Sequence, residues 1–135
     1  MMIQKICVLF QGKYREQVMY LTFGVLATII SIVTFIVCVN FFCLDPLLAN
    51  IISWVISVCF AFVTNRRMVF RSTEQNALKQ FFSFIAGRVF TLLLEEFVFI
   101  LLLLVWHNTA LIKLIGQTVV IITNYIISKF FIFQK

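Results

Sequence analysis

The sequence predicts an all-α integral membrane protein, a bundle of four transmembrane helices, and three observations carry this prediction. Of the 135 residues, 63% are hydrophobic and 12% are charged, so the chain has too little polar surface to cover a core in water. The apolar residues gather in four long runs. The bases stand at the ends of these runs rather than along one face, which favours a membrane over a nucleic acid as the partner.

Each apolar run is long enough for a transmembrane helix, which needs about 20 residues. The expected spans are residues 18–39, 47–64, 81–105 and 111–128. In the first hairpin, Asp45 is placed to cap the second helix and Pro46 to occupy its first turn. In the second hairpin, Asn108 or Thr109 is the expected cap. The chain before the first span is too polar for a cleaved signal peptide, and we expect a short amphipathic lead-in.

The distribution of bases predicts the orientation, because Lys and Arg gather on the cytosolic side of membrane proteins. Nine of the eleven precede the first span, join the second to the third or follow the fourth. The opposite side holds Lys113 alone, at the start of the fourth span. Both termini and the central connection are therefore expected in the cytoplasm. Arg66 and Lys129 are expected to stop the second and fourth helices at the cytosolic interface.

A shift of 63 positions aligns the chain with itself without a gap. The glycines of the first and third spans then coincide, and the motif ending in Phe70 falls on the motif ending in Phe133. Two helices per copy give both copies the same orientation. We therefore expect two parallel repeat units, 17–71 and 80–134, within one domain of residues 1–135.

Two stretches, "ANIISWVISVCFAFVTNRRMVF" (49–70) and "LIKLIGQTVVIITNYIISKFFIF" (111–133), end in the same pattern. A small residue or Asn and an aromatic residue are followed by Asn or Ser, a base, a β-branched residue and Phe. With these two helices the chain resembles the GtrA-like family of small four-helix bacterial membrane proteins. The matching residues are Ala61, Phe62, Asn65, Arg66, Val69 and Phe70, and then Asn124, Tyr125, Ser128, Lys129, Ile132 and Phe133.

The resemblance implies a multi-pass protein of the bacterial cytoplasmic membrane that is not an enzyme. It implies that the protein flips a polyprenyl-phosphate-linked sugar from the cytosolic to the outer leaflet, for glycosylation of surface polysaccharide or teichoic acid. The implied partners are that lipid and the membrane glycosyltransferases of the same pathway. A homo-oligomer is a further expectation, because four helices are few to enclose a lipid path.

Two other classes of function compete with this interpretation. The alternative is a non-transporting subunit that scaffolds a glycosyltransferase. A small proton-coupled drug exporter is disfavoured, because such a protein needs an acid in its first span and residues 18–39 carry no charge. Soluble enzyme chemistry is disfavoured as well, because the sequence offers no nucleophile–base pair, glycine-rich phosphate loop or metal cluster. We expect no cofactor and no metal.

Charges inside the spans need a reason, because each costs on the order of 2.5–3.5 kcal/mol in the bilayer. By helix rise, Arg88 lies about 12 Å below the cytosolic surface, in one layer with Asn124 and Ala61. We expect a polar pocket there, in which the guanidinium binds phosphate and the amide orients it. The alternatives are a charge pair of Arg88 with Glu95, and an amide that only holds helices together.

Lys113 is expected to be a second phosphate contact, near the outer leaflet, where the resemblance also implies a base. The alternative is an interfacial lysine that snorkels outward. Glu95 and Glu96 point about 100° apart on the third helix, so at least one should face the bundle interior. One of them could carry a proton or balance the charge of Arg88. The alternative is that each acid is neutral or is paired with Lys113 near the outer face.

The two cytosolic helix ends are expected to form a basic mouth for an anionic lipid head. Asn65 and Arg66 mark the first end, and Lys129 marks the second. The plainer alternative is a pair of helix ends with aromatic anchors. Val69, Phe70 and Phe133 are further residues of the motif at these ends.

The four cysteines show no CxxC spacing and no pairing with histidine. Cys38 and Cys43 flank the first hairpin, where a disulfide and two free thiols are both compatible with the pattern. Thiols are ordinary small apolar residues in buried helices. The sequence thus leaves this pairing open.

Overall fold

The structure is a computed structural model of the chain, and it describes residues 1–5, 12 and 14–133. Cys7, Lys13 and Lys135 lie outside the described residues. In chain order the helices are α2 (Arg15–Asn40), α3 (Pro46–Thr64), the π-helix η1 (Asn65–Val69), α4 (Ala77–Leu103), α5 (Thr109–Ile127) and the π-helix η2 (Ser128–Ile132). All regular structure in the described part is therefore helical, as predicted.

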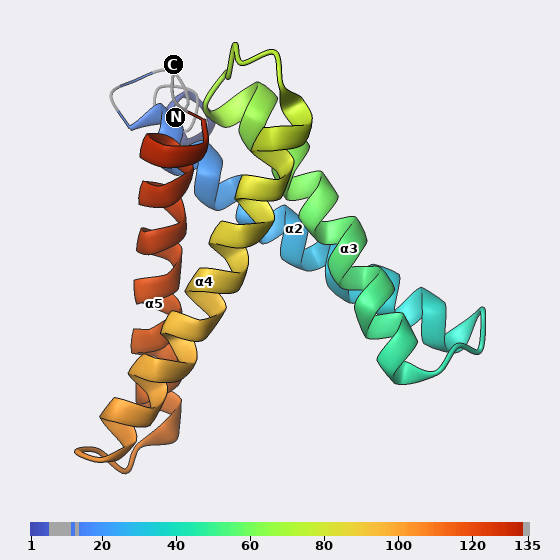
Figure 1. Cartoon of the computed structure of the whole chain (residues 1–135), viewed down its shortest axis with the longest axis vertical. Coiled ribbons are helices and arrows are strands. Elements are labelled where there is room, and N and C mark those ends of the chain that lie inside the picture. Colours follow the sequence, from blue (N-terminus) through green and yellow to red (C-terminus); the bar gives the residue numbers. More distant parts are fainter. Residues whose placement is uncertain (6–11, 13, 134–135) are drawn as a thin grey trace. The chain divides into compact units, whose positions relative to one another are not determined.

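The chain divides into two compact units, Met1–Ser72 and Thr73–Lys135. Each unit consists of a helical hairpin, α2 with α3 in the first and α4 with α5 in the second (Figure 1). The boundary falls between the two repeat units that the sequence predicts. A single domain of residues 1–135 stays a prediction.

The hairpin of the first unit begins its second helix where the sequence predicts. The carboxylate of Asp45 accepts a hydrogen bond from the backbone N–H of Leu47 at 3.0 Å, and Pro46 occupies the first turn of α3. Across the hairpin, the Ser57 hydroxyl donates to the carbonyl of Ala27 at 2.7 Å. Local capping and one interhelical hydrogen bond thus help to hold α3 against α2.

The hairpin of the second unit is capped by asparagines. Asn108 is the residue that caps α5, because its Oδ1 accepts from the backbone N–H of Leu111 at 3.2 Å. Asn76 caps α4 in the same way, accepting from the N–H of Lys79 at 3.1 Å. Asn108 was one of two candidate caps in the sequence, whereas the cap at Asn76 was not predicted.

Three helical segments are long and apolar enough to cross a membrane, namely Arg15–Asn40, Pro46–Val69 and Thr109–Ile132. The remaining long helix, α4, has 27 residues, which is enough for a bilayer. It carries four charged residues, Lys79, Arg88, Glu95 and Glu96. The fourth span, the four-helix bundle and the cytoplasmic termini therefore stay predictions.

The helices run past the bases that were expected to stop them. Beyond α3 and α5 the backbone widens into η1 and η2, which contain Arg66 and Lys129. Each π-helix closes with a hydrogen bond between residues five apart, from Phe70 N–H to Asn65 O at 2.9 Å and from Phe133 N–H to Ser128 O at 2.8 Å. Both phenylalanines are buried, so packing of these rings, rather than the position of a charge, sets the helix end.

The elements of the two units correspond at an offset of 63 residues. Shifted by this number, α3 and η1 coincide with α5 and η2 at both ends, and α2 begins one residue after the start of α4 and ends with it. This is the offset that the sequence predicts. The internal duplication itself stays a prediction.

In each unit the final carbonyls of the π-helix accept hydrogen bonds from the unit's first long helix. Arg15 on α2 donates to Met68 O at 2.7 Å and to Val69 O at 3.4 Å. Gln80 on α4 donates to Ile132 O at 3.2 Å. Carbonyls at a helix end lack intrahelical partners, so these side chains satisfy them and fasten each π-helix to its own hairpin.

Gly87 lies where α4 comes close to the end of α5 and to η2. A Cβ there would lie 3.2 Å from Ile127 Cγ2 and 3.5 Å from Ile132 Cδ1, whereas a Cβ at Gly24 would meet no atom within 4 Å. We expect Gly87→Leu to destabilise the protein by about 1–3 kcal/mol through overpacking. Gly24→Leu is expected to be neutral or stabilising, because leucine favours the helix. Thermal unfolding of both full-length variants in one detergent measures this, and equal midpoints would contradict it.

Candidate functional site

The interface of α4 and α5 carries a row of six polar side chains, which we call the polar track. Its members are Arg88, Thr91 and Glu95 on α4, and Lys113, Gln117 and Asn124 on α5. The spacings of three, four and seven residues place each trio on one side of its helix. Both helices belong to the second unit, where they lie side by side (Figure 1).

The corresponding positions of the first unit are mostly apolar. Shifted by 63, the track falls on Val25, Thr28, Ile32, Asn50, Trp54 and Ala61. Thr28 bonds within its own helix, donating to the carbonyl of Gly24 at 3.1 Å. The polar track is therefore a feature of the second unit.

Glu95 is the centre of one end of the track. Its Oε1 accepts hydrogen bonds from Lys113 Nζ at 2.5 Å and from Gln117 Nε2 at 2.7 Å. The side chain of Glu95 is 10% exposed and that of Lys113 is 55% exposed. A nearly buried carboxylate is thus neutralised by a base that still reaches the surface of the chain.

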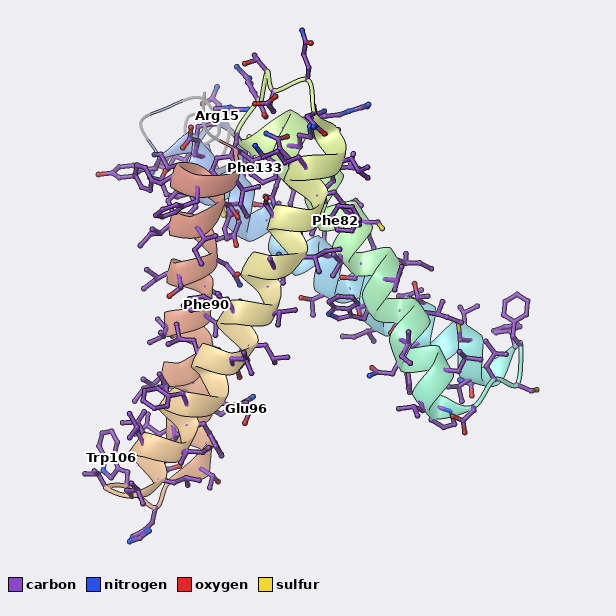
Figure 2. The ribbon with its side chains drawn as sticks, viewed as in Figure 1. Arg15, Phe82, Phe90, Glu96, Trp106 and Phe133 are labelled. Carbon is purple, nitrogen blue, oxygen red and sulfur yellow. The ribbon has the colours of Figure 1, made fainter. Side chains whose placement is uncertain are left out.

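This ion pair decides between the alternatives for Glu95. The sequence offered Arg88 or Lys113 as its partner, and the structure places the carboxylate on Lys113. The reason is geometric: Arg88 and Glu95 are seven residues apart on one helix, about 10 Å along its axis, whereas α5 brings Lys113 directly opposite. Glu96 is exposed and lies on the side of α4 away from α5 (Figure 2).

Asn124 is buried and bonds across the helix interface. The Thr91 hydroxyl lies 2.9 Å from Asn124 Oδ1 and 3.0 Å from the backbone oxygen of Arg88, and it donates to one of them at a time. The amide thus does join helices, which was one of its two expected roles. The other expected role of Asn124, in orienting a phosphate, stays a prediction.

Arg88 is half-buried, and its guanidinium carbon lies 5.0 Å from the centre of the Phe84 ring. A cation over an aromatic face is stabilised without losing its charge or its fork of donors. The Thr91 hydroxyl alternates between the backbone carbonyl of Arg88 and the amide oxygen of Asn124, so it does not bond to the Arg88 side chain. Ala61, their expected neighbour, is buried in the first unit, so the three-residue pocket stays a prediction.

The residues of the two helix ends are mostly buried. Val69 and Phe70 are 1% and 2% exposed, and Phe133 is 2% exposed. Phe70 packs against Tyr20 and Phe133 against Phe84, with ring centres 6.2 and 6.1 Å apart. These three motif residues therefore belong to the core of their own units.

Asn65 differs from the rest of the motif because it is a buried polar group with an unused acceptor. The residue is 3% exposed, and its Oδ1 has no hydrogen-bond partner among the described residues. Such a group costs about 1–3 kcal/mol unless something pairs with it. At the second helix end, Lys129 donates to the Tyr125 hydroxyl at 3.3 Å and lies over the rings of Tyr125 and Phe130.

Sequence reasoning missed Thr91 and Gln117. Both have a signal in the spacing, because Thr91 follows Arg88 by three residues and Gln117 follows Lys113 by four. Residues at these spacings share a helix face. Neither carries a charge, so neither stood out in an apolar run.

The described residues contain no group of three or more His, Cys, Asp or Glu side chains that could hold a metal. Cys38, Cys43 and Cys59 are free thiols, the first buried and the other two exposed. The polar track is thus a set of hydrogen-bond donors and acceptors, with two cations and one buried acid.

Comparison with known proteins places the chain among bacterial membrane proteins. The family described as "GtrA/DPMS, transmembrane domain" matches residues 19–133. The chain is 32% identical to the uncharacterized membrane protein YwcD of Bacillus subtilis over 121 residues, which cover 87% of this chain and 95% of that protein. No solved structure matches it.

Two further relatives carry a functional description. The chain is 37% identical to the cell wall teichoic acid glycosylation protein GtcA of Listeria monocytogenes over 129 residues, covering 93% of this chain and 89% of that protein. It is also 37% identical to the protein of that name from Listeria innocua over 120 residues, covering 86% and 83%.

Proposed function

This chain belongs to the GtrA/DPMS transmembrane-domain family, as a multi-pass membrane protein, and we propose that it flips a polyprenyl-phosphate-linked sugar from the cytosolic to the outer leaflet. The names of the Listeria relatives support a role in the glycosylation of teichoic acid or another surface polymer. The proposed partners are the lipid-linked sugar and the membrane glycosyltransferases that make or use it. The proposed activity is transport without an enzymatic step.

The observation that carries this proposal is the polar track between two largely apolar helices. A phosphate cannot cross hydrocarbon unpaired without a large cost. Arg88 offers a planar fork of donors that matches phosphate oxygens in pairs, and Lys113 offers a point charge. Asn124 lies between them along the track. Donors at successive depths would keep the phosphate paired and so lower the free-energy barrier to its passage across the membrane.

We propose an order for these contacts. Arg66 and Lys129, in the two π-helices, attract the anionic head at the cytosolic side, and the unused Oδ1 of Asn65 accepts a hydrogen bond from a hydroxyl of the head group. Arg88 and Asn124 then bind the phosphate, and Lys113 receives it near the outer side. The polyprenyl tail stays in lipid, against apolar side chains that the helices leave exposed.

We further propose that α4 is a fourth span, so that both termini lie in the cytoplasm and the two units form parallel repeats of one bundle. Two of its charges have compensation within the second unit, since Glu95 pairs with Lys113 and Arg88 lies over Phe84. Compensation of this kind lowers the cost of placing a charged helix in a bilayer. A second copy of the chain would widen the lipid path, because four helices are few to enclose one.

Reconstitution tests the proposed function. The purified protein is inserted into liposomes with a polyprenyl-phosphate sugar, and the sugar that becomes accessible on the far leaflet is measured over time. We expect accessibility to rise with the protein-to-lipid ratio above that of protein-free liposomes. A correctly inserted protein that moves no lipid, but is recovered with a glycosyltransferase in pull-downs, would support the scaffold alternative instead.

A further inference from the structure

The ion pair of Glu95 and Lys113 joins one fixed partner to one mobile partner. We propose that Glu95 is a built-in counter-anion that competes with the ligand's phosphate for Lys113, so that binding exchanges Lys113 from carboxylate to phosphate. This inference rests on the proposed function, because it assumes that the polar track receives a phosphate. It assigns to Glu95 a positioning role that controls how tightly the phosphate is held and how it is released.

The burial of the two side chains supports this exchange. The Glu95 side chain is 10% exposed, whereas that of Lys113 is 55% exposed. Lysine also has a flexible four-carbon stem and three N–H donors on its ammonium group. Lys113 can therefore swing toward a phosphate while Glu95 stays in place. The backbone of α5 passes close to Glu95 at Gly116, where an added Cβ would lie 3.6 Å from Glu95 Cγ.

Gln117 lessens the cost to Glu95 when its cation turns away, without removing that cost. Its Nε2 donates to the same oxygen, Oε1, that accepts from Lys113. When Lys113 turns to a phosphate, this second donor remains on the carboxylate. A buried carboxylate that kept no donor would be strongly unfavourable. Because Gln117 and Lys113 donate to the same oxygen of Glu95, the ion pair can break and re-form while this oxygen keeps a donor.

The same arrangement provides a route for release. When the phosphate begins to leave, the adjacent carboxylate recaptures the ammonium group and returns the site to its neutral resting pair. Without this competitor, Lys113 would hold an anion for longer. The structure therefore predicts that removing the acid strengthens phosphate binding, whereas a purely structural ion pair would weaken binding when broken.

A binding experiment with four variants tests this prediction. The probe is farnesyl phosphate, titrated into full-length protein in phosphatidylcholine nanodiscs, with farnesol as the control for the apolar tail. We expect Glu95→Gln to bind the phosphate about tenfold more tightly than the wild type, a typical size for such coupling. Glu96→Gln, the matched change at the exposed neighbour, is expected to change the affinity much less, because the ion pair of Lys113 is with Glu95 and Glu96 acts on it only through space.

Two further variants show whether the effect runs through Lys113. The double variant E95Q/K113Q should lose the gain, because the ammonium group is gone and no buried acid is left unpaired. Gln117→Leu should bind the phosphate more weakly than the wild type, because Glu95 then depends on Lys113 alone. This last variant keeps the inference testable even if Glu95→Gln fails to fold.

The outcomes separate the inference from the proposed function. If the wild type prefers farnesyl phosphate to farnesol, but Glu95→Gln binds it equally or more weakly, the inference is overturned and the proposed function stands. If neither protein distinguishes the phosphate from farnesol, the phosphate site and the inference both fail. Binding by Glu95→Gln where the wild type binds too weakly to measure would support the inference.

Discussion

Arg88→Ala is expected to lower the rate of lipid translocation by about 100-fold while membrane insertion stays intact. The loss corresponds to the upper part of what a hydrogen bond to a charged group contributes, placed at the barrier. Insertion should survive because Glu95 is paired with Lys113, so that loss of the guanidinium leaves this acid neutralised. The measurement is the liposome assay with matched amounts of inserted protein.

The matched control for this change is Lys79→Ala, which removes the same charge from an exposed position near the start of α4. It should leave the rate close to that of the wild type. Arg88→Lys keeps the charge but not the planar fork of donors, and should restore only part of the rate. Equal losses in Arg88→Ala and Lys79→Ala would assign the effect to net charge and contradict a binding role for Arg88.

The second large effect is on stability. Lys113→Gln is expected to lower the midpoint of thermal unfolding by roughly 5–10 °C, because the nearly buried carboxylate of Glu95 loses its cation and keeps one neutral donor. The double variant E95Q/K113Q should recover most of this loss, since it contains no buried charge. Glu95→Gln alone should have a small effect, because the exposed lysine can turn toward water or the lipid head groups.

Thermal unfolding of the four proteins in one detergent forms a double-mutant cycle that isolates the pair. A midpoint for Lys113→Gln equal to that of the double variant would mean that Glu95 tolerates the loss of its partner. In that case the ion pair would not be the reason for the stability of the α4–α5 hairpin. The wild type, Glu95→Gln and the double variant also enter the binding experiment, so stability and binding are compared for these three proteins.

Much of the local structure could be predicted from the sequence because it depends on neighbouring residues. Asp45 and Pro46 begin α3, and Asn108 caps α5, as their order in the chain predicts. Caps of this kind need only a side-chain oxygen and a backbone N–H two or three residues away. The family motif could be recognised for the same reason, since it is a short pattern at the end of a helix.

The helix ends and the partner of Glu95 could not be predicted with the same success. The π-helices arise where Phe70 and Phe133 find buried positions against Tyr20 and Phe84, which lie about 50 residues earlier in the chain. Arg66 was expected to end a helix and instead lies inside one. A charge at an interface is a weak stop signal when continuing the turn buries a large ring.

What the sequence by itself determined was the class of protein, the start of each hairpin's second helix, the family and the offset of 63 residues between corresponding elements. What only the tertiary structure decided was which side of each helix faces its partner, and therefore that Gln117 and Lys113 meet on one oxygen of Glu95. The physical reason lies in the solvent. In water, an apolar stripe marks the buried side of a helix. In lipid both sides are apolar, so the few polar contacts between helices become visible only when the helices are packed together.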